Sequence, residues 1–383
     1  MVYNKAHKTV CSLEGGLEMQ KIGKILTYLE EQLDEGHIAK VKERFRKVLT
    51  YQKSDRLVLR LCFPCETFNG YPYEEVFADM EKMMVNELVE YCNAVDIKDD
   101  RIPMIRPNYG VGVLPSLFGL KSRVVDNNMP WVDHVKSTDE IRSILNKGVP
   151  NIKSGLGGLI FDTIEYYKEQ LSKYPKCSKL IQIYQPDLQG PFDVVHLIWG
   201  SNVYYALYDE PELVHELLKL VTETYTVFLR ELKKVLNDEY GSFHYHWGSL
   251  FPGHIIIRND TAVNLSKEMY EEFAKYYDEI LLREFGTGSI HYCGRAEQWV
   301  FSMMGCKNLR ALNFGQPPNM IFGTDFLGKI YSKMKEKRLG IVNYGVDKSI
   351  VPDITNSEFD QGITYQTVVE NKKEAVELFE KFL

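Results

Sequence analysis

His291 and Cys293 are the residues whose types and spacing point most directly to chemistry. They stand two residues apart in an apolar-flanked run, 289–294, that has the character of a strand. Side chains at positions i and i+2 of a strand point to the same side, so an imidazole and a thiolate can be presented together. The pair would supply two ligands of a zinc site, which needs at least one more protein ligand and, for catalysis, one position for substrate.

The elements that must position this pair form a repeating pattern along the chain. Apolar periodicity and capping residues predict helices at 17–50 (two helices, broken at Gly36), 74–91, 209–232, 266–286, 326–335 and 372–382. Alternating or continuous apolar runs predict strands at 57–63, 181–184, 242–247, 309–314, 340–344 and 363–367, besides the one that begins at Ser289.

Repeated strand, loop and helix units predict an α/β fold in which helices surround a parallel sheet. Their number favours a closed (β/α)8 TIM barrel over an open sheet. We expect residues 1–55 to form an N-terminal helical extension and residues 56–383 to form the barrel. In a barrel the functional groups lie just after the strands, at their carboxyl ends.

Composition gives no support for two classes of partner. A formal net charge of −7 gives no reason to expect a nucleic acid or an anionic membrane. The sequence contains no run of 18 apolar residues, so we expect a cytoplasmic protein without a membrane span. The 24 tyrosines and 19 phenylalanines leave room for a subunit interface, which keeps a homodimer open.

The seven cysteines are odd in number and scattered, which favours reduced thiols over a disulfide framework. Cys62 and Cys65 have the C-x-x-C spacing of redox and zinc motifs. A redox pair of this kind opens a helix in a thioredoxin-like fold, and a zinc knuckle needs a second pair. Because neither context is visible, we interpret these two cysteines as incidental residues at a strand end.

Polar residues at the expected strand ends would converge in a barrel even though they are distant in sequence. His244 and His246 form a second pair on one side of a strand, so with His291 and Cys293 they could surround one metal ion. The alternative is that these two histidines only make structural hydrogen bonds. The full set of candidates is Glu66, Arg106, Asn108, Asp187, His244, His246, Asp260, His291, Cys293, Asn313 and Asn343.

Three stretches together resemble the uroporphyrinogen decarboxylase superfamily in its wide sense. They are the run 106–113 (RPNYGVGV) with Phe118-Gly119, the run 187–193 (DLQGPFD), and Asn259-Asp260 followed by Leu265-Ser266 and His291-Tyr292-Cys293-Gly294. The superfamily includes the decarboxylases of haem synthesis and the zinc-dependent methyltransferases that serve corrinoid proteins. The resemblance runs from about residue 50 to the C-terminus and implies a (β/α)8 barrel.

Two features of the chain favour the methyltransferase branch. The arginine-rich N-terminal signature of the decarboxylases does not appear before Arg101, whereas the His-x-Cys-Gly of the methyltransferases is kept at 291–294. In that branch the third zinc ligand is the cysteine of a Cys-Gly-Ile, and here the corresponding place reads Gln361-Gly362-Ile363. The missing ligand would then be the Gln361 amide oxygen, or a group from Glu66, Asp187, Glu358, Asp360, His244 or His246.

The resemblance implies a zinc-assisted transfer of a methyl group between a small methylated substrate, or a thiol acceptor, and a corrinoid protein. That separate protein would carry the cobalamin. Asp187, Asp260 and Tyr109 would orient the substrate or move protons. The expected substrate contacts are Arg106, Asn108, Glu66, His246, Asn313 and Gln361. The alternatives are a metal-free lyase of the decarboxylase type, with Arg106 and Arg258 as anion contacts, and a non-catalytic tetrapyrrole or corrinoid binder.

Overall fold

A parallel six-stranded sheet is the centre of the molecule. The structure, a computed structural model, describes residues 21–315, 322–354 and 361–383. The order of the sheet is β1-β13-β12-β11-β10-β9, and β2 and β5 form a separate parallel pair. The bounds of these strands are β1 (Leu59–Cys62), β2 (Met104–Ile105), β5 (Gln182–Ile183), β9 (Ile255–Arg258), β10 (Gly288–Cys293), β11 (Leu309–Gly315), β12 (Gly340–Gly345) and β13 (Ile363–Val368).

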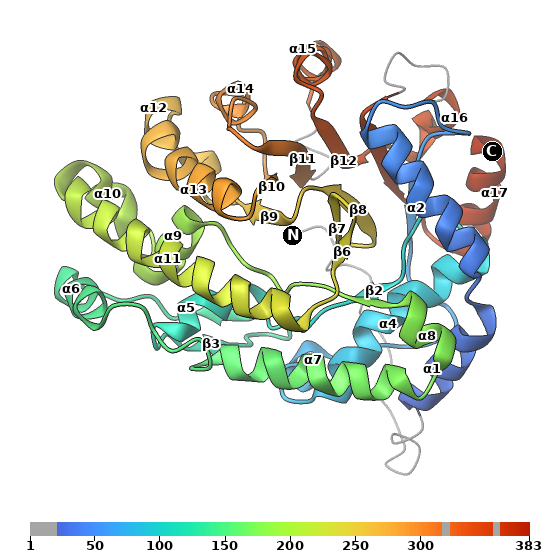
Figure 1. Ribbon diagram of the computed structural model, residues 1–383, viewed down its shortest axis with the longest axis horizontal. Coiled ribbons are helices and arrows are strands. Elements are labelled where there is room, and N and C mark those ends of the chain that lie inside the picture. The colour runs from blue at the N-terminus through green and yellow to red at the C-terminus, as the bar shows by residue number, and fades with distance from the viewer. Residues whose placement is uncertain (1–20, 316–321, 355–360) are drawn as a thin grey trace.

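Helices lie around the outside of these strands (Figure 1). The longest begins at Pro211, which favours the first turn of a helix, and its leucines and valines recur at a spacing of three and four residues. The helices are α1 (Lys21–Gln32), α2 (Glu35–Leu49), α3 (Tyr73–Val76), α4 (Met80–Ile97), α5 (Val113–Leu117), α6 (Thr138–Lys147), α7 (Leu156–Ser172), α8 (Pro175–Leu180), α9 (Pro191–Trp199), α10 (Asn202–Asp209), α11 (Pro211–Val235), α12 (Lys267–Tyr270), α13 (Tyr276–Glu284), α14 (Val300–Met303), α15 (Thr324–Lys337), α16 (Val351–Ile354) and α17 (Lys372–Phe382).

The two faces of the parallel sheet pack against two different cores. Ile257 and Leu312 belong to the larger core, which the outer helices cover. Their neighbours Ile256 and Ala311 belong to a smaller core on the opposite face. This alternation is what the two-residue period of a strand requires when both faces are buried.

An antiparallel sheet fills the smaller core. It consists of β6 (Glu239–Tyr240), β7 (Phe243–His246) and β8 (Ser249–Pro252), and β7 and β8 are joined by a two-residue turn. Strand β8 contacts β10, β11, β12 and α2. Phe243 and Phe251 pack there with Phe45 of α2, so the hairpin and α2 together occupy the face that the outer helices leave free.

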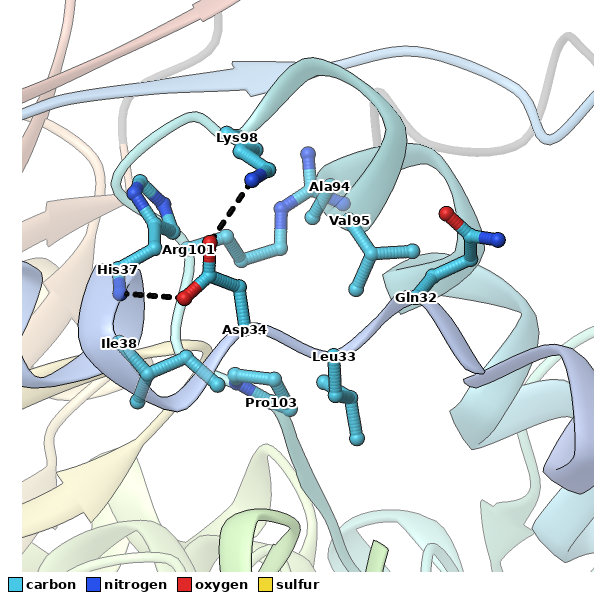
Figure 2. A pocket seen from close by; sticks show the side chains of 10 residues that line it. All are labelled: Gln32, Leu33, Asp34, His37, Ile38, Ala94, Val95, Lys98, Arg101 and Pro103. Atoms are coloured by element: carbon cyan, nitrogen blue, oxygen red, sulfur yellow. Dashed lines mark hydrogen bonds and ion pairs between the residues drawn. The ribbon is translucent and has the colours of Figure 1, made fainter. Parts of the chain in front are cut away.

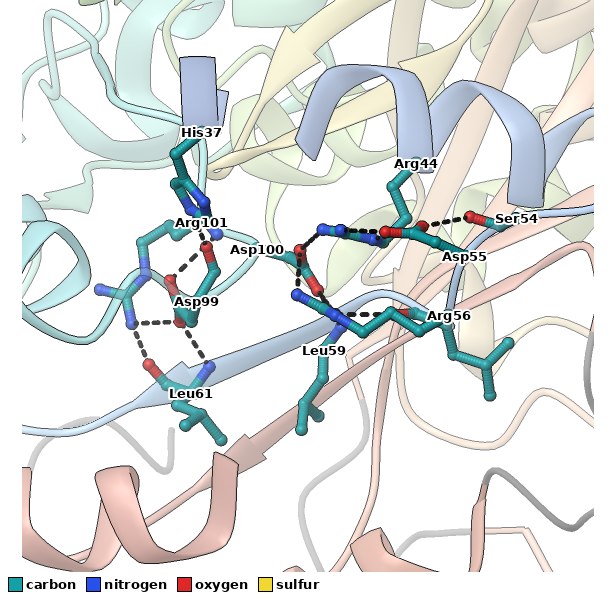
Figure 3. Close-up of polar contacts among 11 residues, drawn as sticks. His37, Arg44, Ser54, Asp55, Arg56, Leu59, Leu61, Asp99, Asp100 and Arg101 are labelled. Carbon is teal, nitrogen blue, oxygen red and sulfur yellow. Dashed lines mark hydrogen bonds and ion pairs between the residues drawn. The ribbon is translucent and has the colours of Figure 1, made fainter. Parts of the chain in front are cut away.

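Charged side chains join β1 to the segment that leads into β2. The backbone N–H groups of Leu59 and Leu61 donate to the carboxylates of Asp100 and Asp99, each at 2.9 Å (Figure 3). Arg44 and Arg56 both bind Asp100, which is fully buried. Carboxylate oxygens therefore accept the strand hydrogen bonds that a neighbouring strand would otherwise accept.

A small cavity of about 20 Å³ lies where the turn between α1 and α2 meets the residues before β2 (Figure 2). Asp34 caps α2 there by accepting from the His37 N–H, and it also binds Lys98. Because this cavity is next to Arg101 and Pro103, at the amino end of β2, it is not part of a site at the carboxyl ends of the strands.

Among the described residues, no helix is both long and apolar enough to cross a membrane.

The predicted parallel sheet with outer helices is confirmed, and two of the predicted details are wrong. The run 242–247 is a strand, but it belongs to the antiparallel hairpin, and the parallel strand of that unit is β9. A parallel strand also precedes Arg106, where the sequence predicted none; β2 is only two residues long, which is too short to produce an apolar pattern.

Candidate metal centre

Three neighbouring parallel strands place the candidate ligands at one edge of the sheet. Arg258 of β9 pairs with His291 of β10, and His291 pairs with Asn313 of β11. Asp260 follows β9 by two residues and therefore lies beside Cys293, the last residue of β10. The ligand atoms of Asp260, His291 and Cys293 all lie within 4.8 Å of one another.

The contacts within this trio are short. His291 Nε2 lies 3.2 Å from Asp260 Oδ1 and 3.4 Å from Cys293 Sγ. The backbone N–H of Cys293 donates to the same Asp260 oxygen at 2.8 Å, which holds the carboxylate in place. His291 is buried, whereas Cys293 is exposed, so the trio opens toward solvent at its cysteine.

Asn313 fixes the orientation of the His291 ring. Its amide nitrogen donates to the carbonyl oxygen of Val342 at 2.6 Å, which leaves its side-chain oxygen 2.5 Å from His291 Nδ1. An amide oxygen only accepts, so the proton of the imidazole stays on Nδ1. In the neutral imidazole the lone pair of Nε2 is then on the side where Asp260 and Cys293 lie, which is the arrangement typical of a histidine that binds a metal ion.

The electrostatics of the trio favour positive charge between its members. Burial lowers the pKa of His291, but the neighbouring Asp260 carboxylate outweighs burial and raises it. Burial opposes ionisation of Asp260, and His291 outweighs it and lowers the pKa of that carboxyl. A carboxylate and a potential thiolate thus face one ring nitrogen, where a proton or a metal ion would supply the compensating charge.

A second buried cluster lies next to the trio. Arg106 and Arg258 both bind Asp187, and although burial raises the pKa of that carboxyl, the two guanidinium groups outweigh burial and lower it. Arg258 also donates to His246 Nε2 at 2.9 Å. Burial and the nearby Arg258 lower the pKa of His246, so this imidazole is neutral and its Nε2 lone pair is already used.

Trp247 connects the two clusters. It stands at the turn of the internal hairpin, with its ring 4.3 Å from the Arg258 guanidinium and 4.9 Å from the His291 ring. The hairpin therefore forms the wall behind His291. Its second histidine, His244, is bonded through Nδ1 to the Gly253 carbonyl at 2.8 Å and contacts neither Asp260 nor Cys293 in the described structure.

Four predicted site residues lie elsewhere. The Tyr109 hydroxyl bonds Thr163 of α7 at 2.8 Å, among the outer helices. Asn108 donates to Glu87 of α4 at 3.0 Å, and Glu66 accepts from the backbone N–H of Lys372 at 2.9 Å. These three side chains are used in joining helices to loops, so the structure does not bring them to His291.

Gln361 is the fourth, and the prediction that it faces the pair is wrong. It precedes β13, whereas His291 and Cys293 end β10, and the two strands are parallel. The backbone of Gln361 bonds the Tyr331 hydroxyl, and the next residue donates to Val48 of α2. Gln361 is therefore at the amino edge. Two other ligands weighed from the sequence, Glu358 and Asp360, lie outside the described residues.

The structure adds two features that the sequence did not suggest. Asp260, expected to orient substrate or move protons, is the third potential ligand. Gly315 ends β11 beside the trio, where a Cβ would lie 2.5 Å from Cys293 Sγ and 2.9 Å from His291 Cε1. The apolar run 255–257 followed by Asp260 was the available signal, because it has the form of a buried strand with an acid just after its end.

Comparison with known proteins gives a likeness of fold. No protein-family model and no curated protein matches the sequence. The structure is similar to that of a methyltransferase from Methanosarcina mazei, with a TM-score of 0.61, over 89% of this chain and 98% of that chain. The two sequences are 14% identical, so the likeness shows the fold.

Proposed function

We propose that this protein is a metal-dependent methyltransferase whose zinc ion is held by Asp260, His291 and Cys293. The observation that carries the proposal is the convergence of these three ligand atoms at the carboxyl edge of the sheet. One nitrogen, one oxygen and one sulfur ligand suit zinc, and three protein ligands leave a position for substrate. The methyltransferase of similar fold supports the reaction class.

Bound zinc would act as a Lewis acid, lowering the pKa of a bound thiol or polarising the atom that carries the methyl group. The chain's own residues do the positioning. Asn313 keeps the proton on His291 Nδ1, and Trp247 closes the space behind the imidazole. The exposed Cys293 side leaves the site open to a small methylated substrate or a thiol acceptor. The methyl group would be exchanged with cobalamin on a separate corrinoid protein, as the superfamily resemblance implies.

The fold proposed for this reaction is a closed (β/α)8 barrel over residues 56–383, with residues 1–55 as an N-terminal helical extension. Two contacts support closure. Asp99 and Asp100 bridge β1 to the start of β2, and the N–H of Gly190, after β5, donates to the Arg258 carbonyl of β9 at 2.8 Å. With the two sheets, these bridges would connect eight parallel strands in one ring.

The test is metal analysis of protein purified without chelators, combined with an assay of methyl transfer. About one zinc per chain is expected, with clear loss in His291→Ala, Cys293→Ser and Asp260→Asn. The matched control is Cys62→Ser, which removes a thiol outside the trio. Methylcobalamin mixed with candidate acceptors should lose its methyl group in a zinc-dependent way, followed by visible absorption. Zinc content that the three variants leave unchanged would sink the proposed centre, and cobalamin binding without transfer would favour a non-catalytic binder.

A further inference from the structure

Arg60 lies on the face of β1 that points into the molecule. Leu59 and Leu61 pack into the larger core, so Arg60 between them points the other way, toward the internal hairpin. Val58, two residues earlier and on the same side, belongs to the smaller core. Arg60 is therefore the next inward side chain after the smaller core, on the way to the carboxyl edge.

The candidate metal centre belongs to the same layer of side chains. On β2, β9 and β11 the residues two positions beyond a side chain of the smaller core are Arg106, Arg258 and Asn313, and the last two pair directly with His291. In the sheet order β10 is the fourth strand from β1, so in the proposed ring of eight strands the two would stand on opposite sides. The interior of such a barrel is just wide enough for side chains to fill. Arg60 and His291 would therefore face one another across it.

Arg60 has no carboxylate partner among the described residues. It is 8% exposed, and its one hydrogen bond there runs from Nη1 to the Ser249 hydroxyl at 3.1 Å. The other buried arginines of the described chain each bind a carboxylate, and they are Arg44, Arg101 and Arg258. Because a buried charge is costly unless it is paired, Arg60 has the character of a group that pairs with a ligand.

Two nitrogens of Arg60 form an open fork. Ser249, which occupies Nη1, passes the hydrogen bond on to Asn343 Oδ1 at 2.8 Å. In the described structure Nε and Nη2 have no partner. Gly248 stands beside Nη2, where a Cβ would lie 3.1 Å from that nitrogen, so the glycine leaves this edge uncovered. Adjacent N–H groups of a guanidinium can donate in parallel to both oxygens of one carboxylate.

We propose that Arg60 binds the carboxylate of a small methylated acid, which is the substrate of the metal centre. The assignment rests on the proposed function, because it places the methyl-bearing atom of that acid at Asp260, His291 and Cys293. One positive charge with two parallel donors matches one planar carboxylate. A phosphate dianion would keep a negative charge unpaired, and a neutral substrate would leave the guanidinium buried without a partner.

The first test measures binding of acids and of their neutral twins to the full chain by calorimetry. The probes are methoxyacetate and 4-methoxybenzoate, and the twins are methoxyacetamide and 4-methoxybenzamide, which have nearly the same shape. At least one acid should bind about 30-fold or more tightly than its amide, and Arg60→Gln should remove that preference. Arg338→Gln, which changes an exposed arginine, is the matched control and should keep it. Acids that bind no better than their amides, or a preference that survives in Arg60→Gln, would overturn the proposal.

Zinc analysis and the methyl-transfer assay on the same preparations separate this proposal from the proposed function. Arg60→Gln should leave the zinc content unchanged, because Arg60 contacts none of the three ligands. Acid binding that depends on Arg60 in a chain without zinc would leave the carboxylate contact standing and refute the metal-dependent transfer. Zinc and transfer in a chain that prefers no acid would do the reverse.

A second measurement needs no ligand. Removing an unpaired buried charge should stabilise the ligand-free chain, so Arg60→Met should raise the midpoint of unfolding in urea. Arg44→Met is the matched control, because it removes a buried guanidinium that binds Asp55 and Asp100, and it should lower the midpoint. A midpoint that falls as far in Arg60→Met as in Arg44→Met would show that Arg60 stabilises the fold, and its assignment to a substrate would be wrong.

Discussion

Two regions of this molecule bury charged groups, and they balance charge in different ways. At the β1 seam, where β1 meets the segment that leads into β2, the buried Asp99 and Asp100 and the largely exposed Asp55 bind Arg44, Arg56 and Arg101, so acids and bases are equal in number and bonded to one another (Figure 3). At the carboxyl edge, Asp260 and Cys293 face a single imidazole whose other nitrogen is already bonded to Asn313.

The difference separates a structural cluster from a candidate site. Burying a charge is costly unless it is paired, and the seam makes its pairs from its own residues. The carboxyl-edge trio has ligand atoms in excess of cations, so an added proton or metal ion would complete it. Mutations in the seam are therefore expected to change folding stability, whereas mutations in the trio are expected to change metal binding.

The largest expected effect comes from removing a buried charge pair at the seam. Asp100→Asn removes the buried carboxylate that Arg44 and Arg56 share, and it leaves two guanidinium groups in a buried place. We expect the free energy of unfolding to fall by roughly 3–5 kcal/mol in denaturant titrations, with zinc content per folded chain unchanged. The control is Asp55→Asn, whose side chain is 64% exposed and whose loss should cost about 1 kcal/mol or less. Equal losses of unfolding free energy in the two variants would mean that the buried charge pairs of the seam do not determine its contribution to stability.

A buried carboxyl group can also stay neutral by keeping its proton, and Asp278 tests this third arrangement. It is fully buried on α13 and accepts from Asn259 at 2.6 Å, and burial raises its pKa to about 7. An acid with a raised folded pKa contributes stability that is present below its unfolded pKa, about 3.9, and is lost as pH rises through about 7. Asp278→Asn should therefore gain on the order of 2–4 kcal/mol relative to the unaltered chain between about pH 4 and pH 8.

The measurement for Asp278 is the unfolding free energy of both proteins across that pH range. Exposed Asp162, on α7, offers the control variant Asp162→Asn, whose difference from the unaltered chain should not change with pH in this way. A constant difference between Asp278→Asn and the unaltered chain would show that the buried carboxyl does not hold its proton.

The His291 and Cys293 pair could be predicted from the sequence, because the alternation of side chains along a strand depends only on neighbouring residues. His291 and Cys293 stand on one side of β10 as their spacing requires. The third ligand depends on the pairing of β9 with β10, a contact between segments more than thirty residues apart, and no local pattern encodes it. The resemblance placed Gln361 in the ligand position, but the last strand begins at Ile363, which puts Gln361 at the wrong edge.

The internal hairpin explains the main error in the fold. Its strand 243–246 alternates as a sheet strand would, and its turn is Trp247-Gly248, both with positive φ. Two-residue hairpin turns favour such angles, and Asn-Gly or Asp-Gly is the usual sequence signal. A tryptophan at this position gives no such signal. It is explained only by its contacts with Arg258 and His291, which are distant in sequence.

Asn313 should change metal affinity without changing the ligands. Asn313→Ala removes the acceptor that holds the proton on His291 Nδ1, so zinc affinity should fall about 10–100-fold in competition with a chelator of known affinity. Asn313→Asp keeps an acceptor at that nitrogen and should restore most of the affinity. If both variants lose affinity equally, Asn313 acts through packing alone and its positioning role is wrong.

The smallest effect should come from Gly315, and it tests whether the trio has room to adjust. A Cβ there would lie 2.5 Å from Cys293 Sγ, so Gly315→Ala must displace the sulfur, and we expect about a tenfold loss of zinc affinity with a stability cost of about 1–2 kcal/mol. The control is Gly345→Ala, at the corresponding end of β12, where a Cβ meets nothing within 4 Å. Because the seam is on another part of the sheet, neither alanine should change the effect of Asp100→Asn. Unchanged zinc affinity in Gly315→Ala would mean that the Cys293 sulfur does not need its present place to bind metal, and the trio would lose its claim to be a preformed site.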